Sequence, residues 1–226
     1  MPTESALPLL RLLQLVSPSL PTGAFTYSQG IEWSVEAGWI RDAADLEAWL
    51  SDQMKSMLAR VDLPLLLRMR QAIVDRDKAQ LDRWIDALLA SRETRELREE
   101  ESNRGRALAD LLGKLELAEA DAWRDDLARS QAAGFAFAAT RWRIPADQLA
   151  LGYAWGWLEN LVLAAVKIIP LGQSEGQRLL ERLAASLAAA VDRARALDDE
   201  DIGAANPALA IASSRHETQY TRLFRS

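Results

Sequence analysis

Apolar residues recur at intervals of three and four along almost the whole of this 226-residue chain. This spacing gathers them on one face of an α-helix, whereas a half-buried β-strand would alternate apolar and polar residues. We find no convincing β-hairpin pattern, that is, two strand-like runs joined by a tight turn. Apolar residues make up 49% of the chain, enough for a substantial core. The sequence therefore predicts an all-α fold, a single-domain bundle of roughly eight to ten helices.

Proline, glycine and aspartate positions indicate where the predicted helices begin and end. Pro8 to Val16 is predicted as a short apolar helix that stops at Ser17-Pro18. Phe25 to Ala37 is predicted as a helix that Gly38 ends, because glycine readily adopts the left-handed conformation found after helix C-termini. The residues expected to begin further helices are Asp42 or Asp45, Asp62 (just before Pro64), Asp77, Pro145 and Ser174.

No internal repeat and no glycine-serine linker divides the chain into separate domains. Acidic residues at Asp198–Asp201 and the pair Asn206-Pro207 mark a short linker near the end. We therefore expect an all-helical domain over residues 1–203 and a C-terminal partner-binding tail over residues 204–226. The tail is expected to be partly disordered when it is unbound.

The last thirteen residues hold the only histidine of an otherwise acidic chain, together with three arginines. If this segment is helical, His216, Tyr220 and Phe224 lie four residues apart and form one aromatic stripe. Arginine and tyrosine are residue types that anchor protein interfaces. Because so short a stripe cannot bury itself, the tail must dock either on its own body or on another protein.

Residues 92–106 form a strongly charged stretch. Three pairs of opposite charge lie four residues apart there and each stabilises a helix by about 0.2–0.5 kcal/mol: Arg92 and Glu96, Arg95 and Glu99, Glu100 and Arg104. The favoured interpretation of this pattern is a solvated helical face.

The longest apolar run, Leu149 to Pro170, is predicted to be a buried helix. Glu159 and Asn160 lie near its centre and Lys167 near its end, and a charge at the centre of a bilayer is costly. Glu159 and Lys167 lie two turns apart on roughly one face, and if buried they must pair or be hydrogen-bonded. The N-terminus lacks the pattern of a secretory signal, so the sequence predicts a cytoplasmic protein with no membrane partner.

Composition and motifs exclude most catalytic and metal-binding classes. The formal charge of −6 argues against a nucleic-acid partner. The chain has no cysteine and one histidine, which excludes zinc ribbons and paired-histidine metal motifs. The phosphate-binding pattern Gly-x-x-x-x-Gly-Lys-Ser/Thr is missing, so no nucleotide site is expected. We predict no catalytic, cofactor-binding or metal-binding residue in this chain. Two alternatives stay open: a helical enzyme that uses Glu159, Lys167 and His216, and a homodimeric scaffold whose tail caps its own body.

Several segments, spread in order over nearly the whole chain, resemble the urease accessory protein UreF family. They are LQLVSPSLPTGAFTYSQGIEW at residues 13–33, Glu93-Thr94-Arg95, Gly105-Arg106, Trp142–Pro145, Leu158–Asn160, Ala165–Gln173, Ile211–Glu217 and Gln219–Ser226. The chain departs from the family pattern at Thr22, Ala24 and Leu161, which affects local turn detail only.

The resemblance implies an all-helical, non-catalytic chaperone for nickel urease that works as a dimer. Members of the family bridge the accessory protein UreD (also called UreH) and the GTPase UreG, modulate its GTPase activity and help to deliver nickel to apo-urease. The resemblance further implies that the partners handle nickel and GTP, and that this chain binds no cofactor tightly.

The same resemblance suggests which residues meet the partners. The tail residues expected to contact UreD are Arg215, His216, Gln219, Tyr220, Arg222, Phe224 and Arg225. The residues expected to form the surface that UreG binds are Tyr27, Ser28, Glu32 and Lys167.

Overall fold

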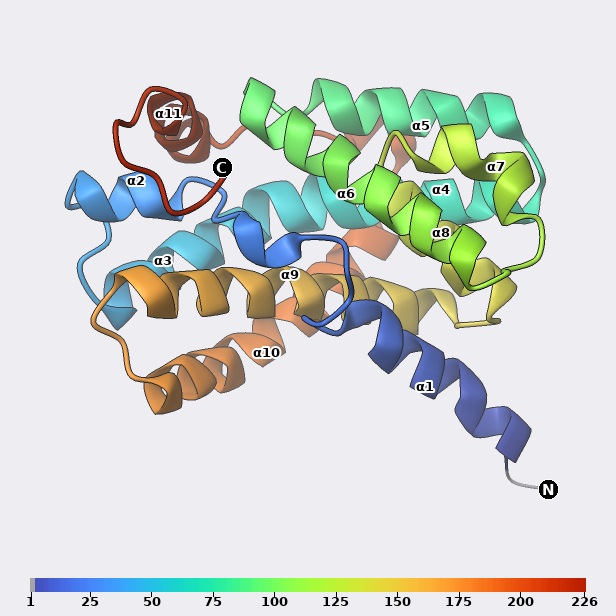
Figure 1. The fold of residues 1–226 in the computed structure, drawn as a ribbon, viewed down its shortest axis with the longest axis horizontal. Coiled ribbons are helices and arrows are strands. Elements are labelled where there is room, and N and C mark those ends of the chain that lie inside the picture. The colour runs from blue at the N-terminus through green and yellow to red at the C-terminus, as the bar shows by residue number, and fades with distance from the viewer. Residues whose placement is uncertain (1–2) are drawn as a thin grey trace.

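The structure is a computed structural model that describes residues 3–226, with side chains from Ala6 onward. Every regular element in this range is helical, so the all-α prediction is confirmed (Figure 1). Most elements are α-helices; η1 and η3 are 3₁₀-helices and η2 is a π-helix. In chain order they are α1 (Thr3–Val16), η1 (Ala24–Thr26), α2 (Ile31–Glu36), α3 (Ala43–Gln53), η2 (Met54–Asp62), α4 (Leu63–Val74), α5 (Lys78–Ala90), α6 (Arg95–Lys114), α7 (Ala120–Leu127), α8 (Gln131–Arg141), α9 (Ala146–Ile168), α10 (Gln173–Arg195), η3 (Asp199–Asp201) and α11 (Pro207–His216).

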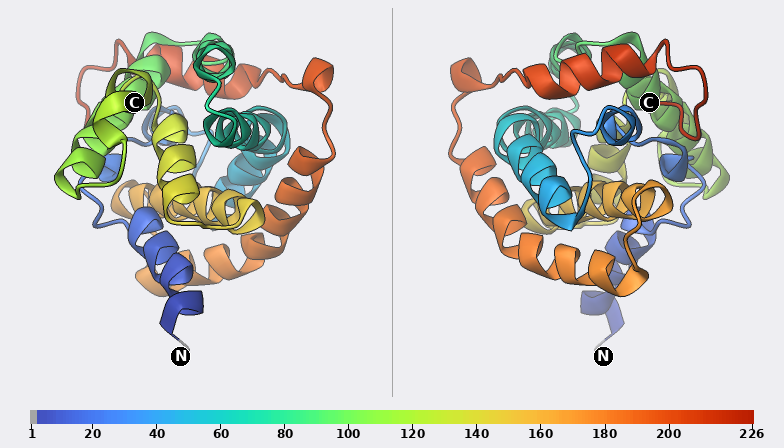
Figure 2. Two further views of the ribbon diagram at one scale, coloured as in Figure 1. Left: turned by 90° about the vertical axis from the view of Figure 1, so that its right-hand side faces the viewer. Right: turned by 90° about the vertical axis from the view of Figure 1, so that its left-hand side faces the viewer.

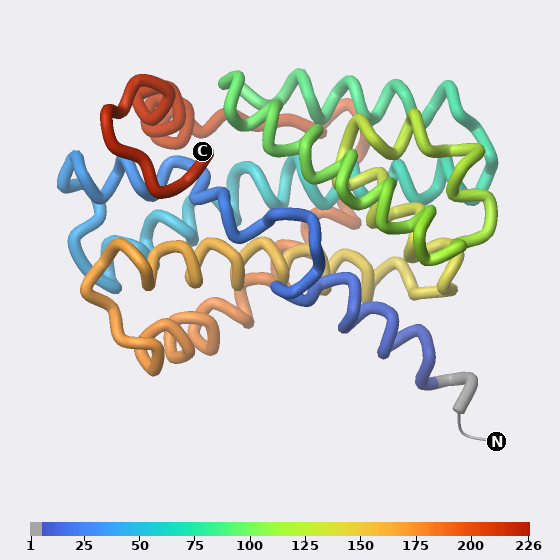
Figure 3. Tube along the Cα trace, in the orientation of Figure 1, coloured from blue at the N-terminus to red at the C-terminus, as the bar shows by residue number. Residues whose placement is uncertain are grey.

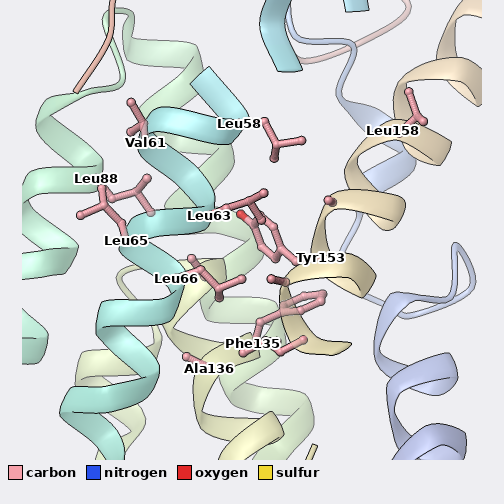
Figure 4. Close-up of a cluster of buried hydrophobic side chains, with 14 of the residues drawn as sticks. Leu58, Val61, Leu63, Leu65, Leu66, Leu88, Phe135, Ala136, Tyr153 and Leu158 are labelled. Atoms are coloured by element: carbon pink, nitrogen blue, oxygen red, sulfur yellow. The ribbon is translucent and has the colours of Figure 1, made fainter. Parts of the chain in front are cut away.

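The core is centred on α4, α8 and α9. Leu63 and Leu66 of α4 face Phe135 of α8 and Tyr153 of α9 (Figure 4). The rings of Phe135 and Tyr153 meet edge to face with centroids 5.2 Å apart, a favourable geometry for aromatic pairs. In the end-on views of Figure 2, α10 and α11 lie on the outside of this bundle.

Small residues set how closely the helices approach one another. A Cβ added at Gly134 of α8 would stand 2.6 Å from a methyl carbon of Leu108 on α6. A Cβ at Gly152 of α9 would meet Leu12 of α1 at the same distance. The lack of a side chain at Gly152 therefore lets α1 come close to α9.

Only the C-terminal part of α1 packs on the body, and the rest projects from it (Figure 3). Leu12 and Leu15 are buried against α9. The other leucines of this helix are at least half exposed: Leu7, Leu9, Leu10 and Leu13.

Several predicted helix boundaries are confirmed. Asp42 begins α3 by accepting hydrogen bonds from Ala44 N and Asp45 N, and Asp77 caps α5 by accepting one from Gln80 N. Gly38 follows α2 with a φ of 73°, the left-handed conformation expected there. Pro145 precedes α9, which ends at Ile168 just before Pro170.

Three boundary predictions are wrong. The helix predicted over Phe25–Ala37 is two pieces, η1 and α2, because Gly30 (φ 79°) interrupts it in the left-handed conformation. Ser174 is not a cap; Gly172 precedes α10 and offers no side chain. The aromatic stripe is not helical either, since α11 ends at His216 and residues 217–226 form turns and irregular chain.

Asp62 directly precedes α4, as predicted, but its side chain does not cap that helix. The segments α3, η2 and α4 follow without a break, and Asp62 has helical backbone angles and makes no capping bond. Pro64 lacks an N–H, so it cannot donate to the carbonyl of Arg60 one turn earlier. That carbonyl instead accepts a hydrogen bond of 3.1 Å from Gly203 N, which attaches the linker before α11 to this helix.

Among the described residues, one helix, α9, is long and apolar enough to cross a membrane, with a mean hydropathy of 1.3 in its most apolar window. However, 56% of that window is buried inside the bundle, against α1, α4 and α10. This agrees with the prediction of a buried helix.

Candidate partner-docking site

Segments from both ends of the chain meet at one end of the bundle. The last ten residues, 217–226, run back from α11 across α2 and η1 to the side of α6 (Figure 1). We call these ten residues the C-terminal segment, and we call the surface of η1, α2, α6 and α9 that receives it the dock. The dock contains much of the motif at residues 13–33 and a large part of the charged stretch at residues 92–106.

Backbone hydrogen bonds hold the end of the C-terminal segment. Ser28 donates to the Ser226 carbonyl from its backbone N–H at 2.8 Å and from its hydroxyl at 2.5 Å. Arg225 N donates to the Thr26 carbonyl at 2.8 Å. The Ser226 hydroxyl donates to the Glu100 carboxylate at 3.0 Å, so the end of the described chain is tied to α6 as well.

Two glutamates and the single histidine form the centre of the dock. Glu32 of α2 accepts hydrogen bonds from Leu223 N at 2.6 Å and from Phe224 N at 2.9 Å. His216 is fully buried, with Nδ1 2.7 Å from Glu96 Oε2 and Nε2 3.2 Å from Glu32 Oε2. The other oxygen of Glu96 accepts from Arg222 Nη1 at 2.7 Å.

Gln29 connects the dock to α6 and α9. Its carbonyl oxygen accepts from Trp157 Nε1 at 3.0 Å, and its amide donates to Glu100 at 3.0 Å. Its φ of 49° lies in the left-handed region, which is uncommon for a residue other than glycine. Asn160 donates to the Tyr27 carbonyl, and Asn103 donates to the Tyr27 hydroxyl, both at 3.4 Å. These bonds hold the Tyr27–Gly30 turn in place below the C-terminal segment.

An aromatic and apolar patch lies exposed beside the dock. Tyr220 is fully exposed, and Leu223 and Phe25 are each more than 60% exposed. The Lys167 ammonium lies 5.5 Å from the ring centroid of Phe224 and 6.0 Å from that of Phe25. A cation at such a distance from a ring is attracted to it, so Lys167 links α9 to both aromatic residues. We call Phe25, Lys167, Tyr220 and Leu223 the exposed patch.

The charged stretch at residues 92–106 is solvated on one side only, and the interpretation as a solvated face is wrong for the side that carries three buried glutamates. Glu96, Glu100 and Glu101 are each at most 5% exposed. Of the three predicted pairs, Arg95–Glu99 forms at the surface and Glu100–Arg104 forms in the interior. Arg92 lies before α6 and instead pairs with Asp62 at 2.6 Å and with Glu101 at 3.2 Å.

Burial shifts the pKa values of this inner cluster. Burial raises the pKa of Asp62, although Arg92 acts in the opposite direction. Burial would also raise the pKa of Glu101, but Arg92 and hydrogen bonds from Ser130 and Ala132 lower it below its ordinary value. Burial raises the pKa of the Tyr153 hydroxyl well above its ordinary value, and the carboxylates of Glu101 and Asp62 add to the shift. Asp62, Arg92, Glu101 and Tyr153 line a cavity of about 60 Å³, large enough for a few water molecules.

The structure separates the predicted site residues into exposed and buried groups. Arg215, Tyr220, Arg222, Arg225 and Lys167 are exposed, and Gln219 is partly buried and donates to Glu36. Buried or nearly buried are His216, Phe224, Tyr27, Ser28 and Glu32. In this conformation a partner can reach the buried group only if the C-terminal segment moves.

Lys167 is exposed and Glu159 is only partly buried, so the condition under which the two were expected to pair is not met. No ion pair joins these two side chains in the described part of the chain, and Lys167 lies over aromatic rings instead. Glu159 is partly buried, and burial raises its pKa. Both ring nitrogens of His216 face glutamates of the dock. Within residues 6–226, no group of three or more His, Asp or Glu side chains could hold a metal ion.

Sequence reasoning missed the residues that form the floor of the dock, namely Gln29, Glu96, Glu100, Trp157 and Asn160. One signal was available: Glu96 and Glu100 lie four residues apart and therefore share one face of α6. That spacing alone does not say whether the face is exposed or buried.

The structure is an all-α bundle with a docked C-terminal segment and with aromatic and cationic side chains exposed in and beside that segment. The sequence model of the UreF family matches residues 40–184. The chain belongs to the UreF family of urease accessory proteins.

Curated relatives extend the match to almost the full chain. The urease accessory protein UreF of Alcanivorax borkumensis is 54% identical over 223 residues, which cover 96% of this chain and 97% of the relative. The UreF of Azoarcus sp. is 50% identical over 230 residues, covering 100% of this chain and 98% of the relative. The UreF of Klebsiella pneumoniae is 50% identical over 217 residues, with coverage of 96% and 97%. The resemblance seen in the sequence motifs is thereby confirmed.

Proposed function

We propose that this chain is a non-catalytic adaptor in the nickel-dependent maturation of urease. It bridges UreD (UreH) and the GTPase UreG, modulates the GTPase activity of UreG and presents the assembly to apo-urease. The proposal includes a homodimer in the cytoplasm, with nickel and GTP held by the partners.

The observation that carries the proposal is the convergence of the segments expected to meet the partners. The C-terminal segment, assigned to UreD, lies on the Tyr27–Glu32 turn and beside Lys167, which were assigned to UreG. Lys167, from the group assigned to UreG, therefore lies beside Phe224, from the group assigned to UreD. Tyrosine is a residue type that contributes strongly to binding when an interface covers it, and Tyr220 is fully exposed here.

The hydrogen bonds of the dock also support the alternative in which the tail caps its own body. The two roles are compatible if the C-terminal segment stays docked while its outer side chains, led by Tyr220, face UreD. They are also compatible if UreD replaces part of the dock. Both versions need the exposed patch to be part of the binding surface.

Co-purification with UreD and UreG tests the proposal. We expect Tyr220→Ala to weaken UreD capture at least tenfold, because truncating an anchoring tyrosine at an interface costs more than about 1.4 kcal/mol. Removal of residues 218–226 is expected to abolish UreD capture. Lys167→Ala is expected to reduce UreG capture in the presence of UreD.

The matched control is Leu115→Ala, an exposed apolar residue just after α6 and outside the dock, which is expected to leave both captures unchanged. Circular dichroism of each variant checks that the fold is retained. Full capture of UreD by the chain that lacks residues 218–226 would refute the role of the tail. Unchanged capture of UreD by Tyr220→Ala would refute the role of the exposed patch.

A further inference from the structure

His216 is the only histidine of the chain, and its environment is unusual. Its side chain is fully buried, and each ring nitrogen faces a different carboxylate. The two glutamates are themselves 5% and 10% exposed, so water has little access to either contact.

A neutral imidazole does not satisfy this arrangement. It has one N–H donor and one nitrogen lone pair, whereas an ionised carboxylate can only accept hydrogen bonds. Whichever tautomer forms, the lone pair would point at an oxygen of Glu32 or Glu96. One additional proton removes the conflict, because the imidazolium donates from both nitrogens.

That proton belongs on His216 rather than on a glutamate. Glu32 already accepts two backbone N–H groups of the C-terminal segment, from Leu223 and Phe224. Glu96 already accepts from the guanidinium of Arg222. Hydrogen bonds and a nearby cation favour the ionised form of a carboxyl group. Both glutamates are therefore held as carboxylates, and the imidazole takes the proton.

The charges of the cluster then balance. The charged groups with printed contacts to this cluster are Glu32 from α2, Glu96 from α6 and Arg222 from the C-terminal segment. Glu217, the residue after His216, accepts hydrogen bonds from Arg95 N and Glu96 N at the start of α6. Two carboxylates face one imidazolium and one guanidinium, whereas a neutral His216 would leave one buried negative charge without a partner, which is costly.

We propose that His216 is held as an imidazolium between Glu32 and Glu96, and that this bound proton latches the C-terminal segment onto the body. The latch works through Glu32, because the carboxylate that receives the imidazolium N–H also holds Leu223 and Phe224. Loss of the proton places a lone pair against one carboxylate and loosens the segment. Docking of the segment therefore takes up a proton whenever the undocked histidine is neutral. The latch itself does not depend on the proposed function. Only its effect on UreD binding rests on that function, because UreD is proposed to bind the C-terminal segment that the latch holds.

The arrangement is not a metal site. The two glutamates lie on opposite nitrogens of one ring, so their oxygens and the ring nitrogens do not converge on a single point. This agrees with the finding that no metal-holding group is present in residues 6–226.

Nitrogen NMR of the full chain tests the latch, because a single histidine gives one unambiguous pair of ring signals. With ¹⁵N-labelled histidine near neutral pH, we expect both ring nitrogens of the natural chain to carry protons. In Glu32→Gln the side-chain amide can donate to Nε2, so we expect a neutral ring with its proton on Nδ1. The matched control is Glu99→Gln, an exposed glutamate of α6, which is expected to keep the imidazolium signature.

Hydrogen exchange of the Leu223 and Phe224 amides gives a second readout, expressed as protection relative to the intrinsic rate at each pH. We expect protection of both amides to fall at least tenfold in Glu32→Gln and to stay unchanged in Glu99→Gln. In the natural chain, a pH titration should show the imidazolium signature and the protection disappearing together. Loss of the signature while protection persists would overturn the latch, as would a neutral ring in the natural chain near neutral pH. Failure of UreD capture with both readouts intact would count against the proposed function alone.

Discussion

Gly105 lies where α6 crosses the chain just before α8. A Cβ added there would stand 2.8 Å from both the backbone N and the backbone C of Ser130, closer than real Cβ contacts allow. Gly113, in the same helix, would bring a Cβ to 3.4 Å from the Asp121 carboxylate, which is an ordinary contact. Two glycines of one helix therefore have different roles: Gly105 permits a close crossing, and Gly113 does not.

Substituting the two glycines separates these roles. We expect Gly105→Ala to lower the free energy of unfolding by about 1–3 kcal/mol, because backbone atoms must move to admit the methyl group. Gly113→Ala is expected to leave the stability unchanged or to raise it by up to about 1 kcal/mol, since alanine favours a helix over glycine. Urea denaturation followed by circular dichroism measures both. Equal effects of the two substitutions would contradict the role given to Gly105.

The sequence of α6 does not predict which of its charged side chains are buried. Its spaced pairs of opposite charge have the pattern of a solvated helix, yet Glu96 binds the C-terminal segment and Glu101 binds Arg92. The i,i+4 spacing shows only that two charges share a face. Most of the partners on this face come from distant parts of the sequence, namely Gln29, Ser130 at the start of α8, and the C-terminal residues His216, Arg222 and Ser226.

The pKa of Glu101 gives α6 a measurable pH signature. Its pKa in the folded protein lies below the ordinary value of 4.5, so its ionised form contributes stability above that value. This contribution is lost as the pH falls through the folded-state pKa. We expect Glu101→Gln to lower the free energy of unfolding by about 3 kcal/mol at neutral pH, because Arg92 loses a buried partner.

The difference between the natural chain and Glu101→Gln should then shrink as the pH is lowered from 5 towards 3. Urea denaturation of both proteins at several pH values measures it. Since Asp62 has a raised pKa, its ionisation acts in the opposite sense, but it is present in both proteins. A difference that stays constant over this pH range would show that Glu101 is not stabilised in its charged form.

At the scale of the whole molecule, the C-terminal segment is an addition to the core and not part of it. The continuous hydrophobic core is built from residues between α1 and α11, and Phe224 is buried outside that core. Side-chain and backbone hydrogen bonds to glutamates and turns hold the segment. Such contacts contribute modest net stability each, and ordering the segment costs conformational entropy. A partner can therefore rearrange the segment without unfolding the bundle.

Removal of residues 218–226 tests this separation. We expect the shortened chain to keep its helical circular dichroism signal and a single cooperative unfolding transition, since the core helices lose no core residue. The amide of Ser28 should lose protection in hydrogen exchange, because the Ser226 carbonyl that accepts its hydrogen bond is gone. Loss of the helical signal or of cooperativity would mean that the C-terminal segment belongs to the core.

The sequence by itself determined the helical class, several helix ends and the family. These features depend on local periodicity, on the backbone limits of proline and glycine, and on motifs read along the chain. Only the tertiary structure decided which charges are buried and how the last ten residues lie. His216 meets Glu32 across 184 residues and Glu96 across 120, so no local pattern could reveal either contact. The expected aromatic helix fails for the same reason: after His216, the backbone N–H groups of Leu223 and Phe224 bond to Glu32 and that of Arg225 to Thr26, in place of the next helical turn.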